Sequence, residues 1–182
     1  MTEANVVQFA NLLLEEAKRF LERAEKAKDK DKAAEVANLH AALMLAFCAL
    51  DAHVNVVADE VARWEHVTKH QRGVLLQKEV RLNDGEFEVG NKSEFSRVQD
   101  RILLLHRIGR GAIKPAPWSQ NLSAAIDLRN KLTHPKAVPA ITAAAVSKAV
   151  EAVIETLDAL YQALYKRRFP AAHRKLASKL DF

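Results

Sequence analysis

The sequence predicts an all-α fold, a bundle of about five helices. Hydrophobic residues make up 49% and charged residues 28% of the 182 residues, which is typical of a globular domain. Five glycines and five prolines leave few turn signals for a strand-rich architecture. Apolar residues recur at steps of three and four along most of the chain, the spacing of a helix face packed on a core. The length fits one domain, residues 1–182.

The first helix is expected from about Glu3 to Lys28, with Thr2 as its N-cap. Its predicted apolar stripe consists of Val6, Phe9, Leu13, Ala17, Phe20 and Ala24. The run AEKAKDKDKAAE follows, in which lysines alternate with acids. We therefore expect a frayed helix end and a solvated connector there, with no role in binding nucleic acid.

The strongest pattern predicts a second helix, whose apolar residues alternate steps of four and three over four heptads. The seam positions are Val36, His40, Leu43, Phe47, Leu50, Val54, Val57, Val61 and Trp64. His40 is expected to be a hydrogen-bonded core histidine, because no second ligand is spaced to share a metal with it. Cys48 is the only cysteine, which excludes an internal disulfide, and its apolar neighbours predict packing in the core.

A short β-hairpin is predicted near residues 80–89, where VRLNDGEFEV places alternating residues around Asp84-Gly85. A third helix should follow, capped by Ser93 and ended by a left-handed Gly109. Its predicted stripe consists of Phe95, Val98, Ile102, Leu105 and Ile108. The loop RGAIKPAPW leads from this helix to the next.

The fourth helix is expected to start near Ser119 or Asn121 and to end at His134, since Pro135 disfavours helical geometry in the residue before it. A fifth helix should begin after Pro139. Its apolar positions again alternate fours and threes: Val146, Val150, Val153, Leu157, Leu160 and Leu164.

Charge and hydropathy restrict the class of protein. The N-terminal segment becomes acidic early and lacks the pattern of a signal peptide, so a cytoplasmic location is expected. The longest uncharged apolar run, Ala41 to Leu50, is shorter than the ~20 residues that cross a bilayer. A net charge of +5 permits a polyanionic partner such as RNA. The basic C-terminal tail, residues 166–182, could contact phosphates, but a solvated charged end explains it as well.

The stretch DLRNKLTHP concentrates chemically useful side chains where a proline stops a helix. Asn130 and His134 are four residues apart and share a face, so Asn130 could orient the imidazole. Arg129 lies at the edge of the apolar stripe formed by Leu128 and its neighbours. One explanation is purely structural, because arginine and histidine both stabilise the C-terminal end of a helix.

A second explanation is RNA cleavage by the RNA's own 2′-hydroxyl group. That reaction needs a proton acceptor, a proton donor and positive charge on the transition state. Histidine can transfer protons near neutral pH, and arginine binds phosphate oxygens with a permanent charge. No cofactor is required, and no metal site is predicted: His66 and His70 are four apart, but no acid or cysteine lies near enough to complete a site. A homodimer would face two copies of His134 across its axis, supplying both an acid and a base.

These residues resemble the Rx4-6H signature of the HEPN superfamily, whose members are all-helical domains. Four residues separate Arg129 from His134, Asn130 follows the arginine and Pro135 follows the histidine. ALDAHVNVVADE resembles the family's earlier helix with polar positions, and PAPW resembles its proline-aromatic approach to the motif. The resemblance spans roughly Ala33 to Leu164, so a HEPN-type core is expected at about residues 33–165.

The resemblance implies a metal-independent endoribonuclease, commonly dimeric, of the kind found among toxins, phage-defence proteins and RNA-processing factors. Its products would carry 2′,3′-cyclic phosphate ends. Arg129 would stabilise the transition state, Asn130 would position the histidine, and His134 would be the general acid or base. Some HEPN proteins also pair with a nucleotidyltransferase-type antitoxin, which would make such a protein a candidate regulator.

Further candidate site residues carry less specific signals. Asp51 and Asn55, four apart on the second helix, could line the same pocket or form a solvated flank. Lys131 and Trp118 could contact RNA, although Trp118 also fits a packing role where the fourth helix begins. The motif does not explain the segment between Gly73 and Asn91. Two other functions stay open: a non-catalytic HEPN-like dimer that binds RNA, nucleotide or a protein partner, and a generic helical interaction protein.

Overall fold

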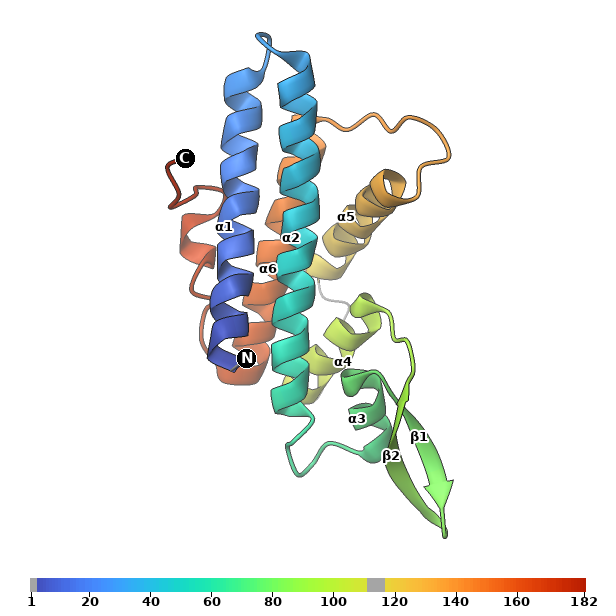
Figure 1. The fold of residues 1–182 in the computed structure, drawn as a ribbon. Helices are drawn as coiled ribbons and strands as arrows, with labels where there is room; N and C mark the ends of the chain where they lie inside the picture. Colours follow the sequence, from blue (N-terminus) through green and yellow to red (C-terminus); the bar gives the residue numbers. More distant parts are fainter. Residues whose placement is uncertain (1–2, 111–116) are drawn as a thin grey trace.

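The computed structural model describes residues 3–110 and 117–182, which form a helical bundle with a projecting β-hairpin (Figure 1). Three long helices lie side by side: α1 (Glu3–Ala27), α2 (Lys32–Val61) and α6 (Ala143–Tyr165). The other elements are α3 (Lys69–Leu76), β1 (Lys78–Asn83), β2 (Glu86–Ser93), α4 (Val98–Arg110), α5 (Pro117–Thr133) and a 3-10 turn (Ala172–Arg174). The predicted all-α class is confirmed, with six α-helices in the described ranges where about five were expected.

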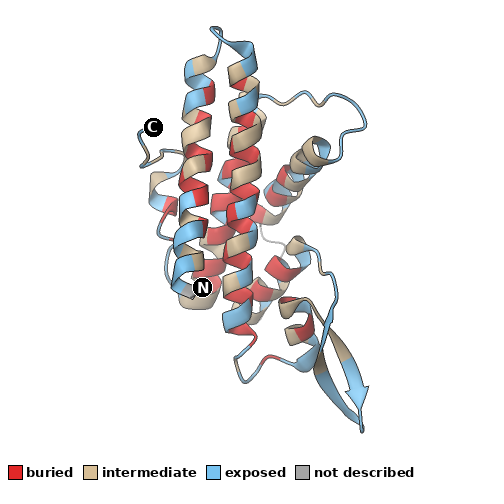
Figure 2. Cartoon of the chain, in the orientation of Figure 1, coloured by how far each residue is buried: buried red, intermediate tan, exposed pale blue. Residues whose placement is uncertain are grey.

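The core lies where the long helices face one another, with α4 and α5 closing it from the side (Figure 2). α2 is central, since it contacts each of the other α-helices described. Its predicted seam is buried at every position from Leu43 to Val61. His40 is only half-buried, whereas His53 is 1% exposed. The core histidine of this helix is therefore His53 and not His40.

The connection between α1 and α2 is shorter than predicted. α1 ends at Ala27 and α2 begins at Lys32, because the Asp31 carboxylate accepts a hydrogen bond from the Ala34 N–H at 3.0 Å and caps the helix. The buried face of α1 is centred on Ala10, Leu14 and Ala17, so Phe9 is exposed instead of packed. Thr2, the predicted cap of α1, lies outside the described residues.

The segment between α2 and α4 contains an element that periodicity did not indicate. α3 starts with a capping box, in which Thr68 and Gln71 each bind the other's backbone N–H, and eight residues are too few for a clear apolar stripe. The predicted hairpin is confirmed. Asp84 and Gly85 both have positive φ, as the tight turn between two antiparallel strands requires. Gly73 lets α3 approach the hairpin, since a Cβ there would lie 2.9 Å from the Lys78 carbonyl.

α4 differs from its prediction at both ends. Ser93 belongs to β2 and does not cap the helix, and Phe95 precedes the first turn. Gly109 lies inside the helix, where a Cβ would be 2.7 Å from the Ala163 backbone. Its role is close packing of α4 on α6, and not helix termination.

The C-terminal end of α5 and the start of α6 agree with the sequence prediction, whereas α5 begins at Pro117, before the predicted Ser119 or Asn121. α5 stops at Thr133, directly before His134 and Pro135. α6 begins after a Thr142 cap, whose hydroxyl accepts from the Ala145 N–H at 3.2 Å. The predicted seam of α6 is buried from Val146 to Leu160.

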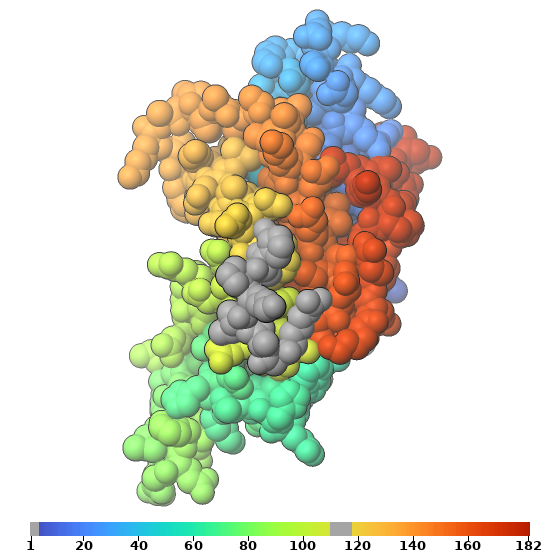
Figure 3. Space-filling model, turned by 180° about the vertical axis from the view of Figure 1, so that it is seen from behind, coloured from blue at the N-terminus to red at the C-terminus, as the bar shows by residue number. Residues whose placement is uncertain are grey.

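The basic C-terminal tail is not a solvated end. It folds back beside α6 and along α1 (Figure 3), burying Phe169 and Ala172. The Arg174 guanidinium donates to Glu15 at 2.7 Å, and the Arg19 guanidinium donates to the Phe182 carbonyl at 2.7 Å. The core is therefore wider than the expected residues 33–165, since both α1 and the tail contribute to it.

Two further observations concern α2. Cys48 is exposed and not packed in the core, because it lies on the face of the helix that turns away from the seam. Within the described ranges, α2 is the one helix whose length and hydropathy would suffice to cross a membrane. More than half of that apolar window is buried inside the bundle, and core helices of soluble proteins have the same character.

Candidate functional site

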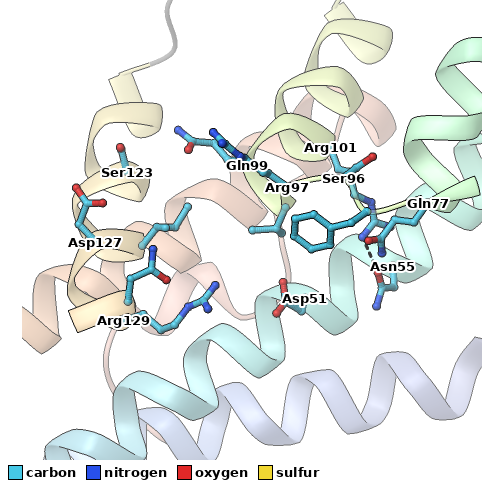
Figure 4. A pocket seen from close by; sticks show the side chains of 14 residues that line it. Asp51, Asn55, Gln77, Ser96, Arg97, Gln99, Arg101, Ser123, Asp127 and Arg129 are labelled. Carbon is cyan, nitrogen blue, oxygen red and sulfur yellow. Dashed lines mark hydrogen bonds between the residues drawn. The ribbon is translucent and has the colours of Figure 1, made fainter. Parts of the chain in front are cut away.

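A polar pocket of about 680 Å³ opens between α2, α5 and the first turn of α4 (Figure 4). Its volume lies within the range of ligand-binding pockets, ~300–1,000 Å³. The lining residues are Asp51, Asn55, Gln77, Phe95, Ser96, Arg97, Val98, Gln99, Arg101, Ser123, Ile126, Asp127, Arg129 and Asn130.

Four of the predicted site residues meet in this pocket. α5 contributes Arg129 and Asn130, and α2 contributes Asp51 and Asn55 from one turn to the next. The two pairs are more than 70 positions apart in the chain. They come together because α5 crosses α2 at this level of the bundle.

Arg129 reaches the pocket across the apolar edge of α2. Its Cζ lies 5.3 Å from the centroid of the Phe47 ring, a cation–π contact that supports the aliphatic stem and the guanidinium together. Among the described residues, the Nε–H of Arg129 is buried without a hydrogen-bond partner. Because Nε is closed off from the pocket, an anionic ligand could use only the terminal Nη donors of the guanidinium.

Asp51 faces the pocket from below (Figure 4). Burial raises the pKa of its carboxyl above the ordinary aspartate value, while the charges of Arg129 and Arg101 oppose that rise. The residue keeps an exposed side toward the open pocket. Among the described contacts, Asp51 receives no hydrogen bond from these two arginines, and such a bond would favour its ionised form.

Arg101 builds one wall of the pocket and is only 5% exposed. Its Nη2 and Nε donate to the Leu75 carbonyl at 2.8 and 3.1 Å, and its Nη1 donates to Asn55 Oδ1 at 2.8 Å. Burial lowers the pKa of Arg101, and the charges of Asp51 and Asp59 act against that shift. One side chain therefore joins the end of α3, the start of α4 and the middle of α2.

His134 does not line the pocket. It is exposed at the end of α5, where its backbone N–H still donates to the Asn130 carbonyl at 2.9 Å. The Thr133 hydroxyl donates to the Arg129 carbonyl at 3.1 Å and covers the last turn. In the described ranges the side chains of Asn130 and His134 form no hydrogen bond with each other. The single chain therefore presents its imidazole beside the pocket and not inside it.

The two candidate RNA contacts lie elsewhere. Lys131 lines a separate hollow of about 530 Å³ between α5 and α6. Trp118 is 8% exposed, and its ring meets the ring of His106 edge to face at 5.4 Å. Of the two roles that the sequence left open for Trp118, RNA contact and packing, the structure shows packing, and the ring is not open to RNA.

Several pocket residues carried no signal of a functional site in the sequence. Arg97, Gln99 and Arg101 belong to α4 or its start, and Gln77 and Phe95 flank the hairpin. The unexplained segment between Gly73 and Asn91 therefore leads directly into a wall of the site. Phe95 is a large apolar residue two positions before Arg97, and its exposure could be recognised only from the structure.

Among the residues described, no group of three or more histidine, cysteine, aspartate or glutamate side chains could hold a metal ion. His66 and His70, the pair that was considered and not predicted as a metal site, each pack on an aromatic ring. The ring centroids lie 5.5 Å from Trp64 and 4.4 Å from Phe87, respectively.

Comparison of the chain with protein-family models, with curated proteins and with solved structures found no match. The site is therefore assessed from its own geometry and chemistry.

Proposed function

We propose that this protein is a metal-independent endoribonuclease of HEPN type, which acts in the cytoplasm as a homodimer. The observation that carries the proposal is the position of the motif. Arg129 and Asn130 share an open polar pocket with Asp51 and Asn55, while His134 is exposed directly after the end of the same helix. A buried or scattered motif would argue for a purely structural role.

Arg129 supplies the fixed positive charge of the proposed reaction. Its guanidinium stays protonated at all physiological pH values and can bind two phosphate oxygens at once. Phe47 supports it from one side, which limits the side-chain freedom lost on binding phosphate. Charge held in place before the reaction stabilises the phosphorane-like transition state more effectively than charge that must reorganise.

His134 supplies the proton transfers, and the dimer supplies the second histidine. One imidazole removes the proton of the 2′-hydroxyl, whose oxygen attacks the phosphorus, and the other protonates the departing 5′ oxygen. The products are a 2′,3′-cyclic phosphate and a 5′-hydroxyl. Because each His134 lies beside its own pocket, a symmetric pair of chains can place both imidazoles at one phosphate.

The resemblance also suggests a biological setting. A toxin or a phage-defence protein would need restraint in the uninfected cell, and a nucleotidyltransferase-type antitoxin is the regulator that the resemblance implies. The exposed position of His134 is compatible with such restraint, because a partner can cover or modify an exposed residue.

The second candidate function is a non-catalytic dimer that binds RNA, nucleotide or a protein partner. One observation favours it: the imidazole of His134 lies outside the pocket and lacks a hydrogen bond to Asn130 that would orient it. In that case the pocket retains RNA without cutting it, and binding weakens steeply with salt as phosphate contacts release counterions. A generic helical interaction protein would show neither behaviour.

The deciding experiment is cleavage of end-labelled structured and unstructured RNAs by purified protein in EDTA. We expect wild type to cut and to leave 2′,3′-cyclic phosphate ends. His134→Ala should reduce the rate by about 10²–10⁴-fold, since it removes the proton-transfer group. Arg129→Met keeps much of the packing on Phe47 and should be similarly impaired. His66→Ala removes an exposed histidine that does not line the pocket and should cut normally.

Circular dichroism and light scattering should show that all four proteins remain helical dimers. Cleavage by His134→Ala at the wild-type rate would refute the catalytic role of the motif. Retention of RNA by every variant without any product would establish the binding module instead.

A further inference from the structure

Phe95 is the most conspicuous side chain on the rim of the pocket. It is 85% exposed, although phenylalanine is normally buried, and it lines the same pocket as Arg129. The backbone that carries it is anchored on both sides. The Glu94 N–H donates to the Gln77 carbonyl at 2.9 Å, and the Arg97 carbonyl accepts from the Arg101 N–H at 3.1 Å as α4 begins. The fold therefore holds an aromatic ring toward solvent on a fixed support.

The side chains around this ring are suited to the edge of a nucleobase. Gln77 and Gln99 both line the pocket, and each carboxamide can donate and accept hydrogen bonds, as the Watson–Crick edge of a base also does. Gln77 ends α3 in the left-handed conformation, with φ of 53°, so its backbone direction is set by that helix end. Besides Phe95, only Val98 and Ile126 are apolar among the described lining residues. This composition favours a ligand with one flat apolar face and polar edges over an apolar protein surface.

Positive charge flanks the ring as well. Arg97 is exposed two residues after Phe95, and Arg129 lies across the pocket on α5. A nucleotide has the matching pattern, with a base that stacks and a phosphate that accepts hydrogen bonds from guanidinium groups.

We propose that the wall formed by residues 94–101 and Gln77 binds an unpaired RNA base next to the scissile phosphate, with the base stacked on Phe95 and the phosphate held by Arg97 and Arg129. The identity of the ligand as RNA rests on the proposed function. The selectivity for unpaired bases follows from the geometry. A base inside an A-form duplex has both faces covered by its neighbours, so only a single-stranded or looped base can stack on an exposed ring.

The test measures binding separately from cleavage. All variants carry His134→Ala, so the RNA stays intact, and the buffer contains EDTA. The probe is an end-labelled single-stranded RNA of mixed sequence and about 12 nucleotides, within the usual site size of a single-strand binding domain. Fluorescence anisotropy reports its affinity, and the same RNA annealed to its complement serves as the paired competitor.

We expect Phe95→Ala to weaken single-strand binding roughly tenfold or more, because an aromatic ring contributes that much to stacking one base. Phe95→Trp should bind at least as well as the parent, whereas Phe95→Leu should behave like alanine. Phe9→Ala removes another exposed phenylalanine, 55% exposed on α1 and outside the pocket lining, and should change nothing. Since Phe95 is exposed, none of these changes should alter the helical content.

Salt dependence separates the ring from the charges. The slope of log affinity against log salt concentration is negative and should be the same for Phe95→Ala and its parent. Arg97→Ala should make that slope less steep by about 0.7, the value for one phosphate contact on a single strand.

Each outcome decides the inference. Equal binding by Phe95→Ala and the parent, or full binding by Phe95→Leu, overturns base stacking. Preferential binding of the RNA duplex over the single strand also overturns it. So does a Phe95→Ala variant that loses the dimer or a protein complex while it still binds RNA. Absence of RNA binding by every protein removes this inference together with the ribonuclease. Phe95-dependent binding combined with no cleavage by the otherwise wild-type chain removes the ribonuclease alone and keeps the base site.

Discussion

Glu15 in the bundle and Asp51 in the pocket are carboxylates placed near arginines, yet their pKa values shift in opposite directions. Burial alone would raise the pKa of Glu15, but it is outweighed by hydrogen bonds from Arg174 and the Lys179 N–H and by the charge of Lys18, so the pKa is lowered. Asp51 has two arginines nearby but no hydrogen bond from either among the described contacts, so burial dominates and its pKa is raised. Direct hydrogen bonds, and not proximity of charge, separate the two sites.

The same contrast extends to the regions around them. In the bundle, Glu15 and Lys18 are buried and paired with each other, and the network around Glu15 holds the C-terminal tail against α1. On the side formed by α3, the hairpin, α4 and α5, polar groups line an open pocket and large apolar residues face solvent, including Leu82 at 66% exposure. The bundle thus buries its ion pairs, whereas the other side leaves polar and large apolar side chains open to solvent. Four predictions test this division, the first expected to have the largest effect.

Glu15→Ala should destabilise the protein by about 3–5 kcal/mol, because it leaves the fully buried Lys18 ammonium without its counterion. Since the pKa of Glu15 is lowered on folding, its contribution is present above the ordinary glutamate pKa and is lost as pH falls through the lowered value. Urea unfolding at neutral pH measures the effect. Glu25→Ala, which breaks an exposed pair with Lys28, should cost less than about 1 kcal/mol. Similar losses for both variants would contradict the contrast.

Arg101→Met should cost about 1.5–3 kcal/mol, since it removes charge-assisted hydrogen bonds to the Leu75 carbonyl and to Asn55. Amide hydrogen exchange should accelerate in α3 and the hairpin and remain slow in α1. Arg97→Met changes an exposed arginine of the same pocket and should be neutral for stability. If amide hydrogens in α3 exchange as slowly in Arg101→Met as in wild type, other contacts hold the pocket wall.

His53→Phe should remove a pH dependence that arises inside the bundle. Burial lowers the pKa of His53 to about 4, and its ring packs against Phe169 at 5.1 Å between centroids. As pH falls below the ordinary histidine pKa, the unfolded chain takes up a proton that the folded chain does not. Wild type should therefore lose roughly 2 kcal/mol through this residue between pH 7 and pH 5. Urea titrations at both pH values should show a smaller loss for His53→Phe, and an unchanged loss would exclude His53 as its source.

Leu82→Ser should change stability by less than about 1 kcal/mol, the usual value of one cross-strand pair, because Leu82 faces solvent opposite Phe87. Leu50→Ala in the bundle, a fully buried position, should cost about 2–5 kcal/mol. Thermal unfolding of the two variants side by side provides the comparison. A large effect of Leu82→Ser would mean that the hairpin is buried against another chain in solution.

The candidate site was predictable only in part. The Arg129, Asn130 and His134 set was visible because it lies on one helix, and helical spacing is a local property. Asp51 and Asn55 could be named as candidates from their spacing on α2, and the structure places both in the pocket with Arg129. The residues of the opposite wall could not be named, because α4 is brought there by contacts made across the bundle.

The sequence by itself determined the all-α class, the seams of α2 and α6, the hairpin turn at Asp84-Gly85 and the stop of α5 before Pro135. Each depends on periodicity, turn chemistry or proline geometry, which act over a few residues. Only the tertiary structure decided that His53 and not His40 is buried, that the tail binds Glu15 from 159 positions away, and that Arg101 holds Asn55 from 46 positions away. Burial and ion pairing depend on which helix faces pack against each other, and the packing of helix faces is decided by the whole bundle.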